Sequence, residues 1–302
     1  MKPVFNLNDI ECTAIDTSRY SEKKIKLLVA RLDTIHPVVS GNKLFKLYYF
    51  VEEALQSTQK TILTFGGAWS NHLVATAYAC KVNGLRSIGI VRGEAAEKLS
   101  VTLNDCIAYG MQLKFISREQ YASKDDEIFL QQLKNEFGDC TIVPEGGYHP
   151  TGARGASLIM DMIKMQNADY VCTAIGTATT FAGLMQQQDA AKKIIGIPVL
   201  KNMTDIPERV RYLNNRFVDE SNLWTDYHFG GYAKYNQALL DFMNELFTNH
   251  HLPTDFVYTG KMMYAVIDKI KQDFFDNHST IICLHTGGLQ GNGSFAAGTL
   301  VF

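Results

Sequence analysis

Lys43 follows directly on a Gly41-Asn42 turn and opens a stretch of helical periodicity. At the start of a helix the dipole disfavours an ammonium charge, and loss of hydration does the same. The amine of Lys43 is therefore a candidate nucleophile toward a carbonyl compound, with a solvated lysine as the alternative. Lys46 stands one helical turn later, close enough to serve the same pocket.

A loop rich in glycine and hydroxyl residues, 176–183, follows the apolar run that ends at Ile175. Its free backbone N–H groups, at the positive end of a helix dipole, suit a phosphate group. No Gly-Lys-Ser/Thr follows, and Ala178 stands where a dinucleotide fingerprint has its second glycine, so a nucleoside triphosphate is disfavoured. An ordinary turn with a threonine cap remains the alternative. Two lysines and a phosphate-type loop together point to a phosphorylated carbonyl compound.

Short runs of Val, Ile and Phe alternate with stretches of helical period, which predicts parallel sheets with crossover helices, the α/β class. The predicted strands are Lys26–Leu32, Thr61–Phe65, Ser87–Val91, Gln112–Ile116, Thr141–Pro144, Tyr170–Ile175, Lys193–Pro198 and Thr280–His285. We expect helices over Lys43–Ser57 and from Ser70-Asn71 onward.

Glycine-bearing segments adjoin four of these predicted strands. Ligands of open α/β sheets bind at the carboxyl ends of strands, so four such loops would converge on one polar pocket. The segments are Ser40–Lys43, Phe65–His72, 176–183 and His285–Gly288.

Composition narrows the function classes further. The 302 residues are 46% hydrophobic and 20% charged with a net charge of −2, values typical of a globular protein, and they disfavour a nucleic-acid or membrane binder. The first residues lack a signal-peptide layout, which favours the cytoplasm. The six cysteines have no metal-ligand spacing, so we expect reduced, buried thiols and no metal. The length allows two domains, with boundaries in the turn-rich segments Val39–Asn42 and Glu145–Gly155.

Seven segments, in order along nearly the whole chain, resemble pyridoxal phosphate enzymes of the 1-aminocyclopropane-1-carboxylate deaminase and D-cysteine desulfhydrase family. The two most specific are the run 40–49 and the run Gly66–His72. The others are Pro144–Gly147, the 176–183 loop, Gly230–Tyr232, Val257–Lys261 and His285–Gly288.

This resemblance implies a two-domain fold of the tryptophan synthase β-subunit type, fold type II of the pyridoxal phosphate enzymes, with flanking helices on parallel sheets. A larger cofactor-binding domain is expected over 1–45 and 151–302 and a smaller α/β domain over 46–150. The resemblance also makes a homodimer the default expectation.

The resemblance further implies roles for individual residues. Lys43 would form the imine with the cofactor aldehyde and move the α-proton, while Ser70, Tyr232 and Tyr258 would be the other catalytic groups. The remaining cofactor-binding residues would be Lys46, Asn71, Gly176, Thr177, Ala178, Thr179, Thr180, Thr259 and Thr286. The substrate, a small amino acid, would be bound by Trp69, Ser70, Asn71 and His72, with its carboxylate on the backbone N–H groups of 70–72.

The chain departs from the deaminase pattern at one informative position. Deaminases of this family carry Glu at the position of Thr259. The desulfhydrases carry Thr there, as this chain does. A hydroxyl group, Thr286, would also face the pyridine nitrogen, which leaves a weaker electron sink that suits loss of a good β leaving group. The sequence therefore predicts a D-cysteine desulfhydrase-like lyase. The alternatives are 1-aminocyclopropane-1-carboxylate deaminase and a non-catalytic ligand-binding protein on the same scaffold.

Overall fold

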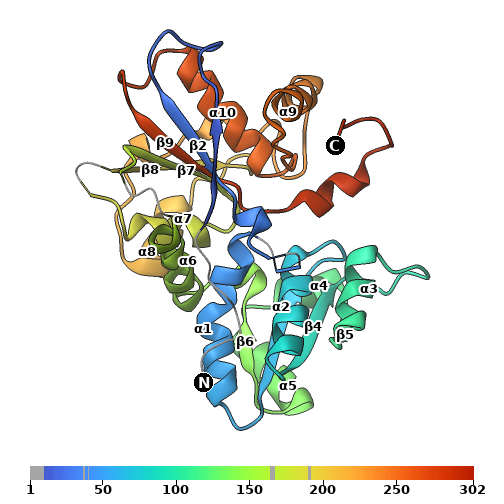
Figure 1. Ribbon diagram of the computed structural model, residues 1–302. Helices are drawn as coiled ribbons and strands as arrows, with labels where there is room; N and C mark the ends of the chain where they lie inside the picture. Colours follow the sequence, from blue (N-terminus) through green and yellow to red (C-terminus); the bar gives the residue numbers. More distant parts are fainter. Residues whose placement is uncertain (1–9, 37, 40, 164–166, 190–191) are drawn as a thin grey trace. The chain divides into compact units, whose positions relative to one another are not determined.

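The computed structural model describes residues 10–36, 38–39, 41–163, 167–189 and 192–302 (Figure 1). Ser40 of the first glycine-bearing segment lies outside the described residues. The chain divides into two compact units, which we describe separately. Unit 1 comprises Lys43–Gly155, and unit 2 comprises Ala156–Phe302 with the described part of Leu7–Asn42.

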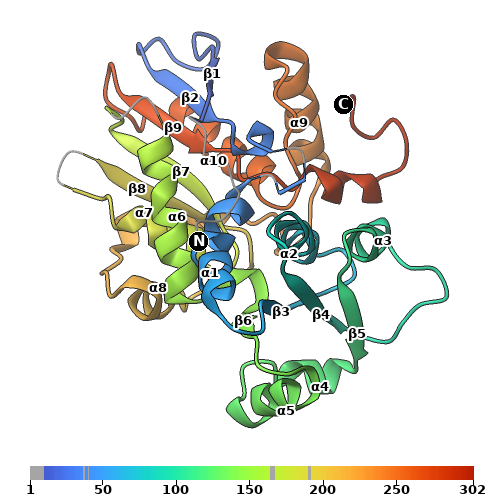
Figure 2. The same ribbon diagram turned by 60° about the horizontal axis from the view of Figure 1, so that its bottom comes forward.

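Unit 1 is built on a parallel sheet of order β5-β4-β3-β6. Its strands are β3 (Thr61–Gly66), β4 (Arg86–Arg92), β5 (Gln112–Ile116) and β6 (Thr141–Val143). The helices associated with it are α1 (Asn42–Gln56), α2 (Asn71–Val82), α3 (Val101–Ala108), α4 (Arg118–Ala122) and α5 (Glu127–Phe137), and η2 (Glu145–Gly147) is a 3-10 turn. Leu73 and Leu103 pack α2 and α3 on one face, while Tyr121 and Leu133 pack α4 and α5 on the other (Figure 2).

Four helices of unit 1 begin at polar residues whose side chains accept a backbone N–H of the first turn. These N-cap residues are Ser70, Ser100, Ser117 and Asp126.

Unit 2 contains a sheet of order β1-β2-β9-β7-β8, in which β1 runs antiparallel to β2 and the remaining pairs are parallel. The strands are β1 (Cys12–Ile15), β2 (Lys26–Ala30), β7 (Tyr170–Ile175), β8 (Lys193–Pro198) and β9 (Thr280–Leu284). The helices are α6 (Pro150–Met162, shared with unit 1), α7 (Thr179–Met185), α8 (Ile206–Asn214), α9 (Gln237–His250) and α10 (Thr259–Lys271). Short 3-10 turns are η1 (Leu32–Thr34), η3 (Glu220–Asn222), η4 (Thr225–Tyr227) and η5 (Leu289–Ser294).

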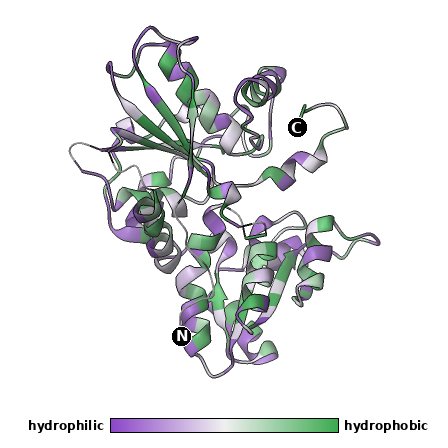
Figure 3. Ribbon diagram, in the orientation of Figure 1, coloured by the Kyte–Doolittle hydropathy of each residue, from purple (hydrophilic) through white to green (hydrophobic). Residues whose placement is uncertain are grey.

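The core of unit 2 lies between its sheet and α10. Alternate strand residues, such as Leu27 and Val29 of β2 or Ile195 and Ile197 of β8, pack against the apolar face of α10. The strands are accordingly mostly hydrophobic along their length (Figure 3). On the opposite face, Gly196 leaves space for the side chains of Ile175 of β7 and Phe181 of α7, since a Cβ at 196 would lie 2.3 Å from Cδ1 of Ile175 and 3.0 Å from the Phe181 ring.

The predicted α/β class is confirmed, and the predicted bounds of β5, β7 and β8 coincide with the observed ones. The sequence analysis missed β1, a four-residue edge strand that is only partly buried. The predicted domains, 1–45 with 151–302 and 46–150, stay a prediction. The six cysteines are free, and five of them are buried. No helix in the described ranges is both long and apolar enough to cross a membrane.

Candidate active site

Lys43 and Lys46 occupy the first turns of α1, in unit 1. Lys43 is half-buried, whereas Lys46 is only 5% exposed. The Nζ of Lys46 donates to the carbonyl of Gly146 at 3.2 Å, and its stem lies against Gly147, where a Cβ would be 3.4 Å away. Burial, and next the charge of Lys43, hold the pKa of Lys46 well below its usual value. An anion beside Lys46 would raise this pKa again, because an opposite charge favours the ammonium form.

The loop between β3 and α2 carries the residues predicted to bind substrate. Ser70 caps α2, its Oγ accepting the N–H of Leu73 at 3.4 Å, and its own N–H donates to the carbonyl of Gly67 at 3.0 Å. The N–H of Ser70 is thus already used, contrary to its predicted share in carboxylate binding. The N–H groups of Asn71 and His72, in the first helical turn, have no intrahelical acceptor. Trp69 is 67% exposed.

His72 is buried and bonded to the strand beneath it. The hydroxyl of Thr64 donates to the carbonyl of Val143 at 2.8 Å, so it accepts from Nε2 of His72 at 3.0 Å, which assigns the proton to Nε2. Burial, followed by the charges of Lys43 and Lys46, lowers the pKa of His72 to about 3. The imidazole is therefore neutral at physiological pH and anchors the first turn of α2.

The predicted phosphate loop in unit 2 runs from the end of β7 into α7. Ala178 has φ +68°, and no side chain caps α7, so N–H groups of its first turn lack intrahelical partners. The hydroxyls of Thr177 and Thr179 lie 2.9 Å apart. The amide of Asn42 donates to the hydroxyl of Thr180 at 2.8 Å, an interaction that the sequence analysis missed. This concentration of N–H and O–H donors suits a phosphate group.

Thr286 follows β9 and lies beside the turn at 41–42. Its carbonyl accepts the N–H of Asn42 at 3.4 Å, and a Cβ on Gly41 would lie only 2.0 Å from that oxygen. Gly41, with φ +72°, is therefore required for this close approach. Asn42 thus joins Thr286 to Thr180 across the carboxyl edge of the sheet in unit 2.

Tyr258 and Tyr232 lie together in unit 2, with ring centroids 6.2 Å apart in an edge-to-face arrangement. Tyr258 is partly buried, and a Cβ on Gly176 would lie 3.0 Å from its ring. Tyr232 is 58% exposed. The phosphate loop and both tyrosines are therefore neighbours.

Thr259 is fully buried and bonded to Asp255, a residue that the sequence analysis did not single out. The Thr259 hydroxyl donates to Oδ1 of Asp255 at 2.6 Å and accepts the N–H of Asp255 at 2.9 Å. The carboxylate also accepts the N–H groups of Val257, Tyr258 and Thr259. Asp255 therefore fixes the start of α10, and the one signal in the sequence is an Asp four residues before a Thr.

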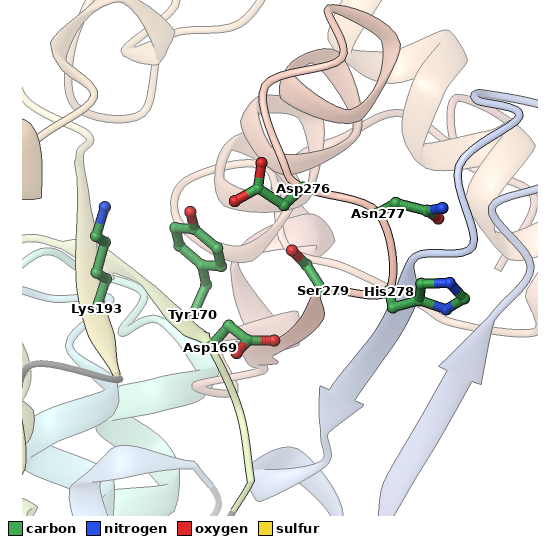
Figure 4. A pocket seen from close by; sticks show the side chains of 7 residues that line it. All are labelled: Asp169, Tyr170, Lys193, Asp276, Asn277, His278 and Ser279. Atoms are coloured by element: carbon green, nitrogen blue, oxygen red, sulfur yellow. The ribbon is translucent and has the colours of Figure 1, made fainter.

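A hollow of about 330 Å³ lies at the other edge of the sheet of unit 2, at the amino ends of β7 and β8 (Figure 4). Asp169 there already accepts the N–H of Thr280 at 2.7 Å, and Asn277 accepts that of Lys24 at 2.9 Å. None of the predicted site residues lines this hollow. Within the described ranges, no group of three or more His, Cys, Asp or Glu could hold a metal ion.

Comparison with known proteins identifies the chemistry. A profile of the family described as "Pyridoxal-phosphate dependent enzyme" matches residues 9–287. The chain belongs to this family. It is an enzyme whose cofactor is pyridoxal phosphate, as the sequence analysis predicted.

Individual relatives agree with the predicted resemblance. A Pyrococcus abyssi protein named "Putative 1-aminocyclopropane-1-carboxylate deaminase" is 30% identical over 288 residues, covering 89% of this chain and 86% of its own. A "D-cysteine desulfhydrase" of Salmonella choleraesuis is 27% identical over 296 residues, covering 89% of each chain. A crystal structure of an ACC deaminase homologue superposes with TM-score 0.79 at 25% identity, over 96% of this chain and 93% of that one. The predicted fold type II is confirmed.

Proposed function

We propose that this enzyme is a β-eliminating lyase that converts D-cysteine and water to pyruvate, ammonia and hydrogen sulfide. The observation that carries the proposal is the buried Thr259–Asp255 pair. Position 259 holds a hydroxyl bonded to a carboxylate, where the resemblance gives the deaminases a glutamate. A second carboxylate has no room or solvation there.

Each unit, taken by itself, carries groups of the kind that bind this cofactor. We assign Lys43 as the amine that links the cofactor, Lys46 as a phosphate ligand and Asn71 as the partner of the 3-hydroxyl. The loop 176–180 supplies the N–H and O–H donors for a phosphate, and Thr286 supplies a hydroxyl for the ring nitrogen. Pyridoxal phosphate, when bound, supplies the electron sink for an amino acid that loses its α-proton.

The chain's own groups then move the protons. The amine of Lys43 takes the α-proton, since an amine with reduced hydration is an effective base. The departing thiolate receives a proton from a hydroxyl group, for which Ser70, Tyr232 and Tyr258 are the candidates. Ser70 suits this role because its Oγ accepts from Leu73, which leaves its own hydrogen available. The first-turn N–H groups of α2 bind the substrate carboxylate, and the exposed Trp69 shapes the substrate's surroundings.

A second candidate function is 1-aminocyclopropane-1-carboxylate deamination, because that activity is in the name of the relative with 30% identity. We further propose that the protein is a homodimer and that it lies in the cytoplasm. A mass measurement in solution tests the first proposal, and cell fractionation tests the second.

A panel of amino acids, incubated with the purified holoenzyme and assayed for keto acid and ammonia, tests the proposal. We expect pyruvate and sulfide from D-cysteine, and little 2-oxobutyrate from 1-aminocyclopropane-1-carboxylate. Greater turnover of 1-aminocyclopropane-1-carboxylate would support the deaminase. Absence of turnover with either amino acid would contradict both candidate reactions.

A further inference from the structure

Lys261, on the first turn of α10, is a fully buried lysine outside the roles assigned above. Its Nζ donates to the carbonyl of His228 at 2.8 Å and to that of Gly231 at 2.7 Å. Both carbonyls belong to the loop that leads directly into Tyr232. One ammonium group thus ties this loop to α10.

The loop needs such a tie because its backbone is strained. Phe229 and Ala233, which both carry a Cβ, have φ of +52° and +53°. Positive φ at a non-glycine residue is costly and persists only where the surroundings hold it. Within the loop, the N–H of Gly231 donates to the carbonyl of His228 at 3.0 Å, and that of Gly230 donates to Nδ1 of His228 at 2.9 Å. The N–H of Lys234 donates to the carbonyl of Gly231 at 3.1 Å.

The segment just before α10 fixes the second tyrosine. Asp255 accepts the N–H of Tyr258 at 2.7 Å, immediately before α10. Burial lowers the pKa of Lys261 to about 8, and the negative charge of Asp255 opposes that shift. Charge-assisted hydrogen bonds of this kind are stronger than neutral ones. The start of α10 therefore holds the backbones of both tyrosines, one through Asp255 and one through Lys261.

We propose that Lys261 is a positioning residue that holds Tyr232 in edge contact with Tyr258. The inference rests on the proposed function, which gives these tyrosines their place beside the substrate. Lys261 acts through Tyr232 and not through the cofactor.

A double-mutant cycle tests the coupling. In Lys261→Met, kcat/KM for D-cysteine should fall at least about 10-fold, because the loop loses both of its hydrogen bonds to the charged ammonium group. Affinity for pyridoxal phosphate and the visible spectrum should stay unchanged. Because Lys261 acts through Tyr232, the fall should vanish in a Tyr232→Phe background. Equal losses in both backgrounds would overturn the proposal. Lys271→Met, on the exposed end of the same helix, is the matched control and should behave as wild type.

Hydrogen exchange provides a readout that needs no turnover. Amides of 228–235 should exchange at least about tenfold faster in Lys261→Met than in wild type, with α9 unchanged. Unaltered exchange would overturn the proposal.

If the variant does not fold, hydrogen exchange of the wild-type protein is the test. Its amides of 228–235 should exchange more slowly than those of the exposed loop 93–99, and equal rates would refute the tie. If wild type turns over no amino acid, the proposed function fails, while this comparison still decides the role of Lys261.

Discussion

The hydroxyl of Thr259 is bonded twice to one buried aspartate, and the proposed reaction rests on this side chain. Its hydrogen goes to the Asp255 carboxylate, and it receives the Asp255 N–H. The carboxylate's other bonds go to three backbone N–H groups. Nothing at this position can act as a free carboxylate toward a substrate.

Thr259→Glu should therefore lower both stability and desulfhydration without creating a deaminase. The new carboxylate would meet Asp255 in a buried place and forfeit a hydrogen bond to a charged group, worth about 1.5–3 kcal/mol. Urea unfolding and pyruvate release from D-cysteine measure the two effects. Thr259→Ser, which keeps the hydroxyl, is the control. A Glu variant with wild-type stability would contradict the assigned role of Asp255.

Lys46→Ala should weaken the affinity for pyridoxal phosphate about 10- to 100-fold, because one hydrogen bond to a charged phosphate is lost. Saturating pyridoxal phosphate should restore much of the activity of Lys46→Ala.

Lys43→Ala should stay inactive at any cofactor concentration, because no other amine replaces that of Lys43. Titration of each apoenzyme, followed by turnover at saturation, checks both statements. Rescue of Lys43→Ala and not of Lys46→Ala would reverse the two roles.

His72 should make the protein sensitive to acid. Its pKa is about 3 in the folded chain against an ordinary 6.5, so the unfolded chain takes up the proton first. The stability contribution is complete above pH 6.5 and is lost as the pH falls toward 3, by at most about 1.4 kcal/mol per pH unit. His72→Gln should flatten the decline of the urea midpoint between pH 6 and 4. Parallel curves for the two proteins would argue against this assignment.

At the scale of elements, close helix packing in unit 1 depends on one glycine. Gly155, in α6, faces the carbonyl of Phe45 in α1, and a Cβ there would lie 2.1 Å from that oxygen. A backbone oxygen cannot rotate away as a side chain can. The early turns of α1, which carry Lys43 and Lys46, are held in place by this contact.

Gly155→Ala should destabilise the protein. Alanine stabilises a helix by about 1 kcal/mol relative to glycine, whereas overpacking costs about 1–3 kcal/mol. Because the clash here is with a backbone oxygen, we expect a cost near 3 kcal/mol, which exceeds the gain. Gly293→Ala, where a Cβ would meet nothing within 4 Å, should change stability by less than about 0.5 kcal/mol. Thermal unfolding of both variants checks this, and a Gly155→Ala variant as stable as wild type would refute the close contact.

The sequence predicted the elements well because buried parallel strands are continuous apolar runs, as in β7 and β8. It predicted the start of α2 because Ser70 is an ordinary N-cap residue. It could not predict the partners of Lys261, since backbone carbonyls 30 and 33 residues away have no signature in side-chain type. The bond from Asn42 to Thr180 spans 138 residues and is equally invisible.

At the scale of the whole molecule, the family match extends over residues 9–287, so it includes both lysines of α1 and, except for Gly288, every predicted loop of unit 2. A shared fold and cofactor leave the reaction open, because members of one fold support different chemistries. The relatives illustrate this, since one is named a deaminase and another a desulfhydrase. The roles proposed for the tyrosines and Thr259 all presuppose that Lys43 is the amine that carries the cofactor.

Borohydride reduction of the holoenzyme, followed by digestion and mass spectrometry, tests that assignment most directly. Reduction fixes the cofactor covalently to the amine that holds it. We predict loss of the visible band and a single phosphopyridoxyl label on the peptide that contains Lys43. A label on Lys46 or on the buried Lys261 would contradict the account.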